Sequence, residues 1–179
     1  MLLNGVGSVG KTSIARALQV VVEAPYLHMQ MDTFMEMLPD RYQEGPEGFA
    51  YEVLHDRDGR PSVAITTGPV GRRALQGMRH AVAAMAGQGN NLILDDVILD
   101  GEMDEYVRLL APFELLTVGV KAPLDVLERR ERERGDRMIG LARWQFDRVH
   151  RDFAYDLEVD TAVASPVECA TLIQRRFGL

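Results

Sequence analysis

A glycine-rich motif at positions 5–12 restricts the fold more than any other feature of the sequence. It reads Gly-Val-Gly-Ser-Val-Gly-Lys-Thr and matches the G-x-x-x-x-G-K-[ST] pattern of phosphate-binding loops. Glycine adopts backbone angles closed to other residues, so such a loop can wrap closely around a phosphate. Its N–H groups then form an anion-binding nest, and the helix that follows directs its positive end at the same phosphates. The motif predicts a site for a nucleoside triphosphate.

Each position of the motif has an expected role. Lys11 should reach the β- and γ-phosphates, and the hydroxyl of Thr12 should be a ligand of Mg²⁺. A chance glycine-rich turn is the alternative, but the apolar run at 1–4 predicts a strand before the motif and the periodicity of 12–22 a helix after it. The residues expected to bind the nucleotide are Gly5, Gly7, Ser8, Val9, Gly10, Lys11, Thr12 and Ser13.

Composition limits the class of protein. A length of 179 residues is typical of one domain, and the net charge of −7 argues against a nucleic-acid partner. No apolar run reaches the length of a membrane span, and no signal peptide precedes the loop, so we expect a cytoplasmic protein that does not bind membranes. The single cysteine, Cys169, lies in an apolar helical pattern and is expected in the core.

Strands and helices alternate along the chain, and most of the strands are apolar throughout. This pattern predicts an α/β fold with a parallel sheet covered by helices on both faces. An Asp-Gly pair in a polar link predicts a small β-hairpin beside the sheet, with strands at 51–54 and 62–65. The other expected strands are 26–31, 91–97, 113–120 and 155–159, and the other expected helices are 33–38, 71–86, 103–110, 123–134, 140–153 and 166–177, with a loop at 40–50.

Three carboxylates follow predicted strands, where open α/β sheets bind their ligands. Asp95 and Asp96 end the strand at 91–97, and one of them should hold Mg²⁺ while the other caps the next segment. Successive strand residues face opposite ways, so both cannot reach one ion; we favour Asp95 for the metal. Asp96 and Val97 are also expected at the substrate.

Asp32 follows the second strand and is the candidate general base, which would accept the proton of an attacking hydroxyl. The alternative is an N-cap for the helix at 33–38. Phe34 and Met35 come directly after it and either form an apolar wall for the substrate or pack in the core.

An arginine-rich segment lies between Leu127 and Arg137 and suggests a lid over the triphosphate. Most of its arginines are expected at the surface, and Glu128 and Arg132 are expected to form a solvated ion pair. Arg134 and Arg137 flank Gly135-Asp136 and are the candidates for phosphate contact.

Several stretches, in order, also match one known family. They are Leu3-Asn4-Gly5 leading into Gly10-Lys11-Thr12, Met31-Asp32-Thr33, Leu92-Ile93-Leu94-Asp95-Asp96-Val97, Arg134-Gly135-Asp136-Arg137 and Tyr155-Asp156-Leu157-Glu158-Val159-Asp160-Thr161. Over nearly its whole length the sequence resembles the chloramphenicol phosphotransferases, which are small phosphate-loop kinases.

The resemblance implies transfer of phosphate from ATP, with Mg²⁺, to a primary hydroxyl of chloramphenicol, and it implies that Asp32 is the base. It also implies the three-layer fold of nucleotide-monophosphate and shikimate kinases, with a five-stranded parallel sheet. We expect one kinase domain over 1–179, with a lid at about 128–143 and an acceptor-binding insertion at about 33–70. A homo-oligomer is possible.

Two other functions remain open at this point. One is a kinase of a sugar nucleotide, as in zeta-type toxins, which would need a basic groove near Asp32. The other is a nucleotide-dependent switch without acceptor chemistry, which would need no positioned base.

Overall fold

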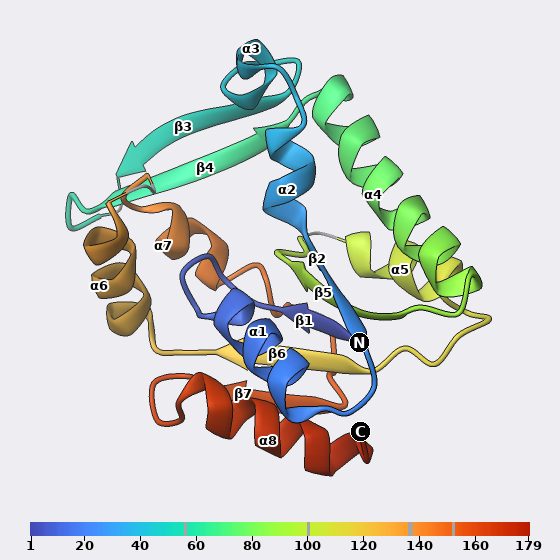
Figure 1. Cartoon of the computed structure of the whole chain (residues 1–179). Coiled ribbons are helices and arrows are strands. Elements are labelled where there is room, and N and C mark those ends of the chain that lie inside the picture. The colour runs from blue at the N-terminus through green and yellow to red at the C-terminus, as the bar shows by residue number, and fades with distance from the viewer. Residues whose placement is uncertain (56, 100, 136–137, 152) are drawn as a thin grey trace.

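Five parallel strands form the central sheet, in the order β2-β5-β1-β6-β7. The structure is a computed structural model that describes residues 1–179 except 56, 100, 136–137 and 152 (Figure 1). The strands are β1 (Leu2–Asn4), β2 (Tyr26–Gln30), β5 (Asn91–Asp96), β6 (Thr117–Lys121) and β7 (Leu157–Asp160). The predicted five-stranded parallel sheet is confirmed.

Helices cover both faces of this sheet. On one face, α1 (Lys11–Val21) and α8 (Pro166–Phe177) pack on a core that includes Leu3 and Ile93. On the other, α4 (Pro69–Gly87) and α5 (Glu102–Leu109) pack on Leu2 and Leu94, among others. Neighbouring residues of one strand thus belong to the hydrophobic cores on opposite faces of the sheet, because successive strand side chains point to opposite faces. Most positions of the central strands β1, β5 and β6 are therefore buried, which explains the apolar runs of the sequence.

A two-stranded antiparallel hairpin lies apart from the sheet, formed by β3 (Phe49–His55) and β4 (Pro61–Thr67). Figure 1 shows it beside α2 (Met31–Glu36) and α3 (Asp40–Gln43), facing the side where α6 (Leu124–Arg134) and α7 (Leu141–Phe146) lie. Its β4 strand meets the turn before α7, where the backbone N–H of Val63 donates to the carbonyl of Gly140 over 2.9 Å. Gly140 has a φ of 104°, and a Cβ there would lie 2.7 Å from the carbonyl oxygen of Pro61. The predicted hairpin is confirmed, and it is longer than expected.

Several predicted boundaries were wrong. The strand predicted at 26–31 ends at Gln30, and the helix after it begins at Met31, so Asp32 lies inside its first turn. The predicted loop at 40–50 contains α3. The strand predicted at 113–120 begins only at Thr117, because its partner β1 begins at Leu2, which pairs with that residue. The helix predicted at 140–153 is regular only over α7.

Other predictions of local structure are confirmed. Ser165 and Glu168 form the reciprocal capping box of α8. Cys169 is buried in the core between α8 and the sheet. Within the described part of the chain, no helix is both long enough and apolar enough to cross a membrane.

Asn4 links three segments behind the phosphate-binding loop. It is the last residue of β1, and its side chain is buried at 1% exposure. Its Nδ2 donates to the carbonyl of Val149 over 2.9 Å and to the hydroxyl of Tyr155 over 2.8 Å. Its Oδ1 accepts from the N–H of Ile98 over 2.9 Å. A buried amide thus replaces the apolar residue that the strand pattern alone would suggest.

We expect Asn4→Leu to lower the free energy of unfolding by about 2 to 5 kcal/mol, because it leaves buried polar groups of three other residues without that partner. The matched control is Asn91→Leu, which makes the same exchange at an exposed position of β5. Denaturant unfolding measures both. Equal stability of the two variants would contradict this account of Asn4.

Candidate nucleotide and acceptor site

The loop between β1 and α1 has the backbone of an anion cradle. Ser8 has a φ of 63° and Gly10 a φ of 101°, and Gly10 is the N-cap of α1. Gly5 packs so tightly that a Cβ would lie 2.5 Å from the carbonyl oxygen of Val120, so only glycine fits there. The N-terminus of an 11-residue helix therefore points its N–H groups into the loop.

Lys11 and Thr12, the first two residues of α1, have side chains on the same edge of the sheet. The buried ammonium of Lys11 donates to the carbonyl of Gly5 over 2.8 Å and to that of Val6 over 3.2 Å, and it lies 3.7 Å from Asp95 Oδ1. The Thr12 hydroxyl donates to Asp95 Oδ2 over 2.6 Å. One carboxylate therefore meets both side chains that the motif places at the phosphates.

Several groups determine the charge of Asp95. Burial on its own would raise the pKa of this carboxyl. The neighbouring His28 imidazole, the Lys11 ammonium and the Thr12 hydroxyl outweigh burial, so the pKa lies below its ordinary value. His28 Nε2 lies 3.6 Å from Asp95 Oδ2, just outside hydrogen-bond distance, and has no hydrogen-bond partner among the described residues. Asp95 is thus a buried, ionised carboxylate whose oxygens can accept hydrogen bonds or bind a cation.

Asp96 faces the opposite side of the sheet. The Tyr106 hydroxyl of α5 donates to its Oδ2 over 2.7 Å, and the N–H of Val97 donates to its Oδ1 over 2.7 Å. Burial raises the pKa of Asp96 more than these hydrogen bonds lower it. The guanidinium of Arg79, buried on α4, pairs with Glu105 and stacks near the Tyr106 ring. The two adjacent acids thus occupy different environments, as the strand geometry predicted.

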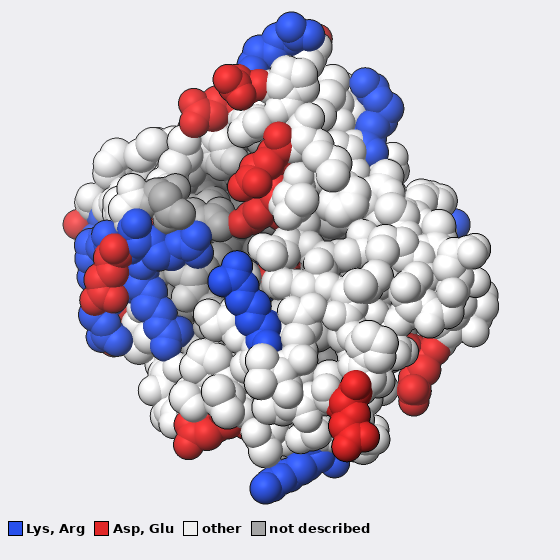
Figure 2. All heavy atoms as spheres, in the orientation of Figure 1, with Lys and Arg blue, Asp and Glu red and all other residues white. Residues whose placement is uncertain are grey.

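A single cleft of about 480 Å³ runs over this edge of the sheet. The phosphate-binding loop, Arg130 and Thr161 line one end, while side chains of α2 and the hairpin line the other. Figure 2 shows basic side chains gathered beside the hollow over α6 and α1, and acidic side chains on the α2 side. On the side of α2 and the hairpin, the lining residues are Gln30, Met31, Asp32, Met35, Tyr51, Ile65 and Val97.

The structure brings most of the predicted site residues together. Ser8, Val9, Ser13, Asp95 and Asp96 line the cleft, as do the other loop residues from Gly7 onward. Arg134 lies at its edge. Gly5 lies behind the loop, where its carbonyl accepts from Lys11. Arg137 lies outside the described residues.

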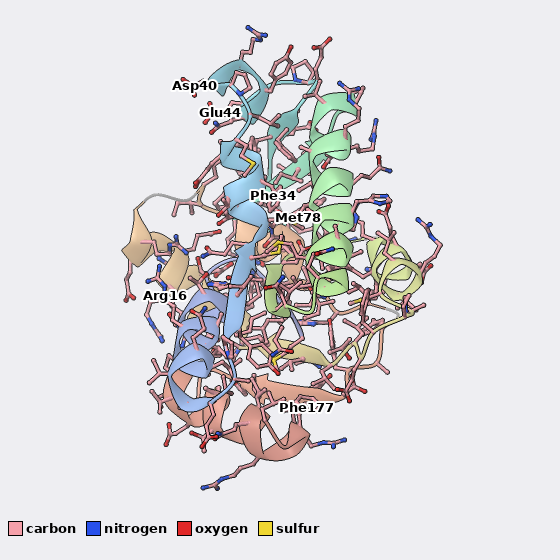
Figure 3. The ribbon with its side chains drawn as sticks, turned by 45° about the vertical axis from the view of Figure 1, so that its right-hand side comes forward. Arg16, Phe34, Asp40, Glu44, Met78 and Phe177 are labelled. Carbon is pink, nitrogen blue, oxygen red and sulfur yellow. The ribbon has the colours of Figure 1, made fainter. Side chains whose placement is uncertain are left out.

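Phe34 does not belong to the cleft. It packs against the core beneath α4, and Figure 3 shows it next to Met78 of that helix. Met35, one position later, does line the cleft. Successive helical residues point about 100° apart, so Phe34 and Met35 cannot both face the substrate. The sequence alone does not show which of the two does.

Sequence reasoning missed Arg130. Its guanidinium donates to the hydroxyl and the carbonyl of Thr161, over 2.8 and 2.7 Å, and it borders the cleft. The helical spacing with Arg134 was the available signal, since residues four apart share a face. That spacing could not show which face of α6 borders the nucleotide end of the cleft.

The lid helix is joined to α7 by a buried acid. Glu131 is only 2% exposed, and its two oxygens accept from the N–H groups of Gly140 and Ala142 over 2.7 and 2.8 Å. Glu128, expected to pair with Arg132, pairs instead with Arg143 of α7. Within this charged helix the sequence does not distinguish these acids from surface residues, because their partners come from another element.

Comparison with known proteins identifies the family of this chain. The family described as "Chloramphenicol phosphotransferase-like protein" matches residues 1–178. The chain belongs to this family. It is 34% identical over 172 residues to a protein of Mycobacterium tuberculosis (strain ATCC 25618 / H37Rv) named "Putative O-phosphotransferase Rv2636", which covers 93% of this chain and 76% of the relative. This family membership makes the protein a kinase-like enzyme.

The solved structures of a tunicamycin resistance protein and of two kinases share the fold. A tunicamycin resistance protein from Deinococcus radiodurans has a TM-score of 0.66 at 17% identity, covering 100% of this chain and 95% of that one. A gluconokinase from Sinorhizobium meliloti 1021 has a TM-score of 0.61 at 18% identity, covering 98% and 91%. A shikimate kinase from Acinetobacter baumannii, in complex with shikimate, has a TM-score of 0.58 at 13% identity, covering 99% and 92%.

We expect Arg130→Ala to weaken ATP binding roughly tenfold to a hundredfold, because charged hydrogen bonds at the nucleotide end are lost. Arg129→Ala is the matched control: it is the preceding arginine of the same helix, exposed, and 4.0 Å from Glu133. Titration calorimetry measures both dissociation constants. If the two variants bind ATP equally well, Arg130 has no role at the nucleotide.

Proposed function

We propose that this protein transfers the γ-phosphoryl group of ATP, in the presence of Mg²⁺, to a hydroxyl group of a small neutral molecule. The observation that carries the proposal is one continuous cleft. It joins the loop, Lys11 and Thr12 at one end to an apolar wall with a single carboxylate, Asp32, at the other. A phosphoryl donor and a hydroxyl acceptor could therefore meet inside it.

The donor set beside the loop fits Mg²⁺. The hydroxyl of Thr12 and the ionised carboxylate of Asp95 are oxygen ligands 2.6 Å apart. Mg²⁺ bound with a nucleotide typically uses one or two protein ligands, several waters and the substrate phosphates. A cation held by these two residues would supply positive charge that offsets part of the negative charge of the phosphates. These two residues would hold it, while Asp96 is occupied by Tyr106.

The residues of this chain supply the other requirements of phosphoryl transfer. Lys11 and the loop N–H groups orient the triphosphate, and Arg130 and Arg134 add positive charge at the lid. Asp32, in the first turn of α2, accepts the proton of the acceptor hydroxyl as its oxygen attacks the γ-phosphorus. The domain is then divided in function, with a lid at about 128–143 and an acceptor-binding insertion at about 33–70.

The acceptor end favours a neutral, largely apolar compound. Met31, Met35, Tyr51, Ile65 and Val97 line this part of the cleft, together with the carboxylate of Asp32 and the amide of Gln30. A sugar nucleotide would bring its phosphates close to the Asp32 carboxylate, and like charges repel. The family name suggests chloramphenicol, or a similar hydroxyl-bearing antibiotic, as the first acceptor to test. A nucleotide switch would not need an enclosed acceptor wall at all.

With ATP and Mg²⁺, we expect chloramphenicol to stimulate ADP formation and to gain the mass of one phosphoryl group. Mass spectrometry of the product measures the transfer, and a panel of other hydroxyl compounds tests the acceptor range. ATP hydrolysis that no acceptor stimulates would overturn the proposed function and favour a switch.

We expect Asp32→Asn to lower kcat by about a hundredfold to ten-thousandfold, because the attacking hydroxyl loses its proton acceptor. ATP affinity should stay within about threefold, since the residue lies at the acceptor end. The control is Glu36→Gln, an exposed acid one turn later on the same helix. Transfer by Asp32→Asn at the rate of the control would remove Asp32 as the base.

A further inference from the structure

Gln145 lies where the nucleotide end of the cleft meets the acceptor end. It is on α7, it is only 4% exposed, and it is among the residues that line the cleft. Its Oε1 accepts a hydrogen bond of 2.8 Å from the backbone N–H of Gly7, in the phosphate-binding loop. A buried polar side chain therefore touches the loop from a helix about 138 residues away in sequence.

Chemistry fixes the orientation of this amide. A backbone N–H can only donate, so the atom that faces Gly7 must be the oxygen. The planar group then directs its two Nε2 donors away from that contact. Gln145 Nε2 makes no hydrogen bond to the described residues. Among these residues, His28 Nε2 is the only fully buried side-chain polar atom without a partner, so Gln145 Nε2 is accessible to solvent. The open neighbour of Gln145 is the cleft.

The position of α7 is fixed from two sides. Glu131 of the lid helix accepts from the N–H groups at its start, and the carbonyl of Gly140 accepts from Val63 of the hairpin. The same short helix thus contacts the lid, the acceptor hairpin and, through Gln145, the loop. If a phosphoryl group moves from the loop toward the hairpin, the side chain of Gln145, which lines the same cleft and contacts the loop, borders its path.

We propose that Gln145 is a catalytic residue that donates from Nε2 to an oxygen of the transferred phosphoryl group while its Oε1 holds Gly7. This inference rests on the proposed function. As the acceptor oxygen bonds to the γ-phosphorus, the bond from that phosphorus to the bridging oxygen of ADP breaks. The hydroxyl proton goes to Asp32, and Gln145 neither gains nor loses a proton.

A neutral donor at this place has a specific use. The negative charge of a loose transition state is spread over the three equatorial phosphoryl oxygens. Lys11 and the lid arginines attract all the phosphates of both ATP and ADP. A donor aimed only at the γ-phosphoryl group stabilises bound ATP and the transition state, but not bound ADP. A preorganised donor in a water-poor cleft contributes most when it meets charge that develops during the reaction.

Two substitutions separate the two contacts of Gln145. Gln145→Glu keeps an oxygen that can accept from Gly7 but replaces the Nε2 donor by a second, negatively charged oxygen. Gln145→Met removes both the acceptor and the donor at similar volume. Gln76→Glu, an exposed position of α4, controls for the added charge.

Calorimetry of ATP and of ADP binding, each with Mg²⁺, gives the decisive comparison. We expect Gln145→Glu to weaken ATP binding about tenfold more than it weakens ADP binding, because both nucleotides meet the added charge but only ATP carries the γ-phosphoryl group. Gln145→Met should weaken both, since the loop around the β-phosphate also loses its support. In the transfer assay, kcat of Gln145→Glu should fall about a hundredfold, as for the loss of one oxyanion donor.

Equal losses of ATP and ADP affinity in Gln145→Glu would overturn the proposal and leave Gln145 as a support of the loop alone. Unchanged affinity for both nucleotides would overturn it as well. If the unsubstituted protein transfers phosphate to no acceptor, the proposed function fails, but the comparison of ATP with ADP still tests the contact.

Discussion

The hydrogen bond between Thr12 and Asp95 joins the two elements on which the site depends. Thr12 belongs to the first turn of α1, and Asp95 is near the carboxyl end of β5, paired with Leu3 of β1. This contact places the start of the helix, and therefore the phosphate-binding loop, against a buried ionised carboxylate. Because β5 alternates its side chains, the next residue, Asp96, turns to the other face and is held there by Tyr106. One strand thus supplies an ionised carboxylate beside the loop and a buried, hydrogen-bonded acid in consecutive positions.

Helix α6 is less independent of the core than its charged sequence suggests. Arg130 contacts Thr161 in the loop after β7, and Glu131, its neighbour, is buried against the start of α7. Two adjacent residues of one helix therefore connect it to the loop after β7 and to α7. Their long charged side chains satisfy backbone groups of other segments, which is why a helix rich in arginine and glutamate can lie over a cleft.

The extent to which the sequence predicts this molecule differs between its features. The loop, the parallel sheet and the hairpin follow from local signals: spaced glycines, apolar runs and an Asp-Gly turn. The opposite orientations of Asp95 and Asp96 follow from strand geometry alone. In contrast, Gln145 and Glu131 could not be found, because their partners, Gly7 and the start of α7, are brought to them only by the fold. Phe34 and Met35 show the same limit on one helix, since a shift of one residue in its start changes which of them faces the cleft.

A hydrogen bond between backbone atoms links the hairpin to the turn before α7. The N–H of Val63 meets the carbonyl of Gly140, and the lack of a side chain at Gly140 allows this approach. Because main-chain groups are the same in every residue, this hydrogen bond does not require particular side chains on the hairpin. Tyr51 and Ile65 line the cleft from the hairpin and take no part in the bond. Substitutions that reshape this wall of the cleft can therefore leave the link between the hairpin and α7 in place.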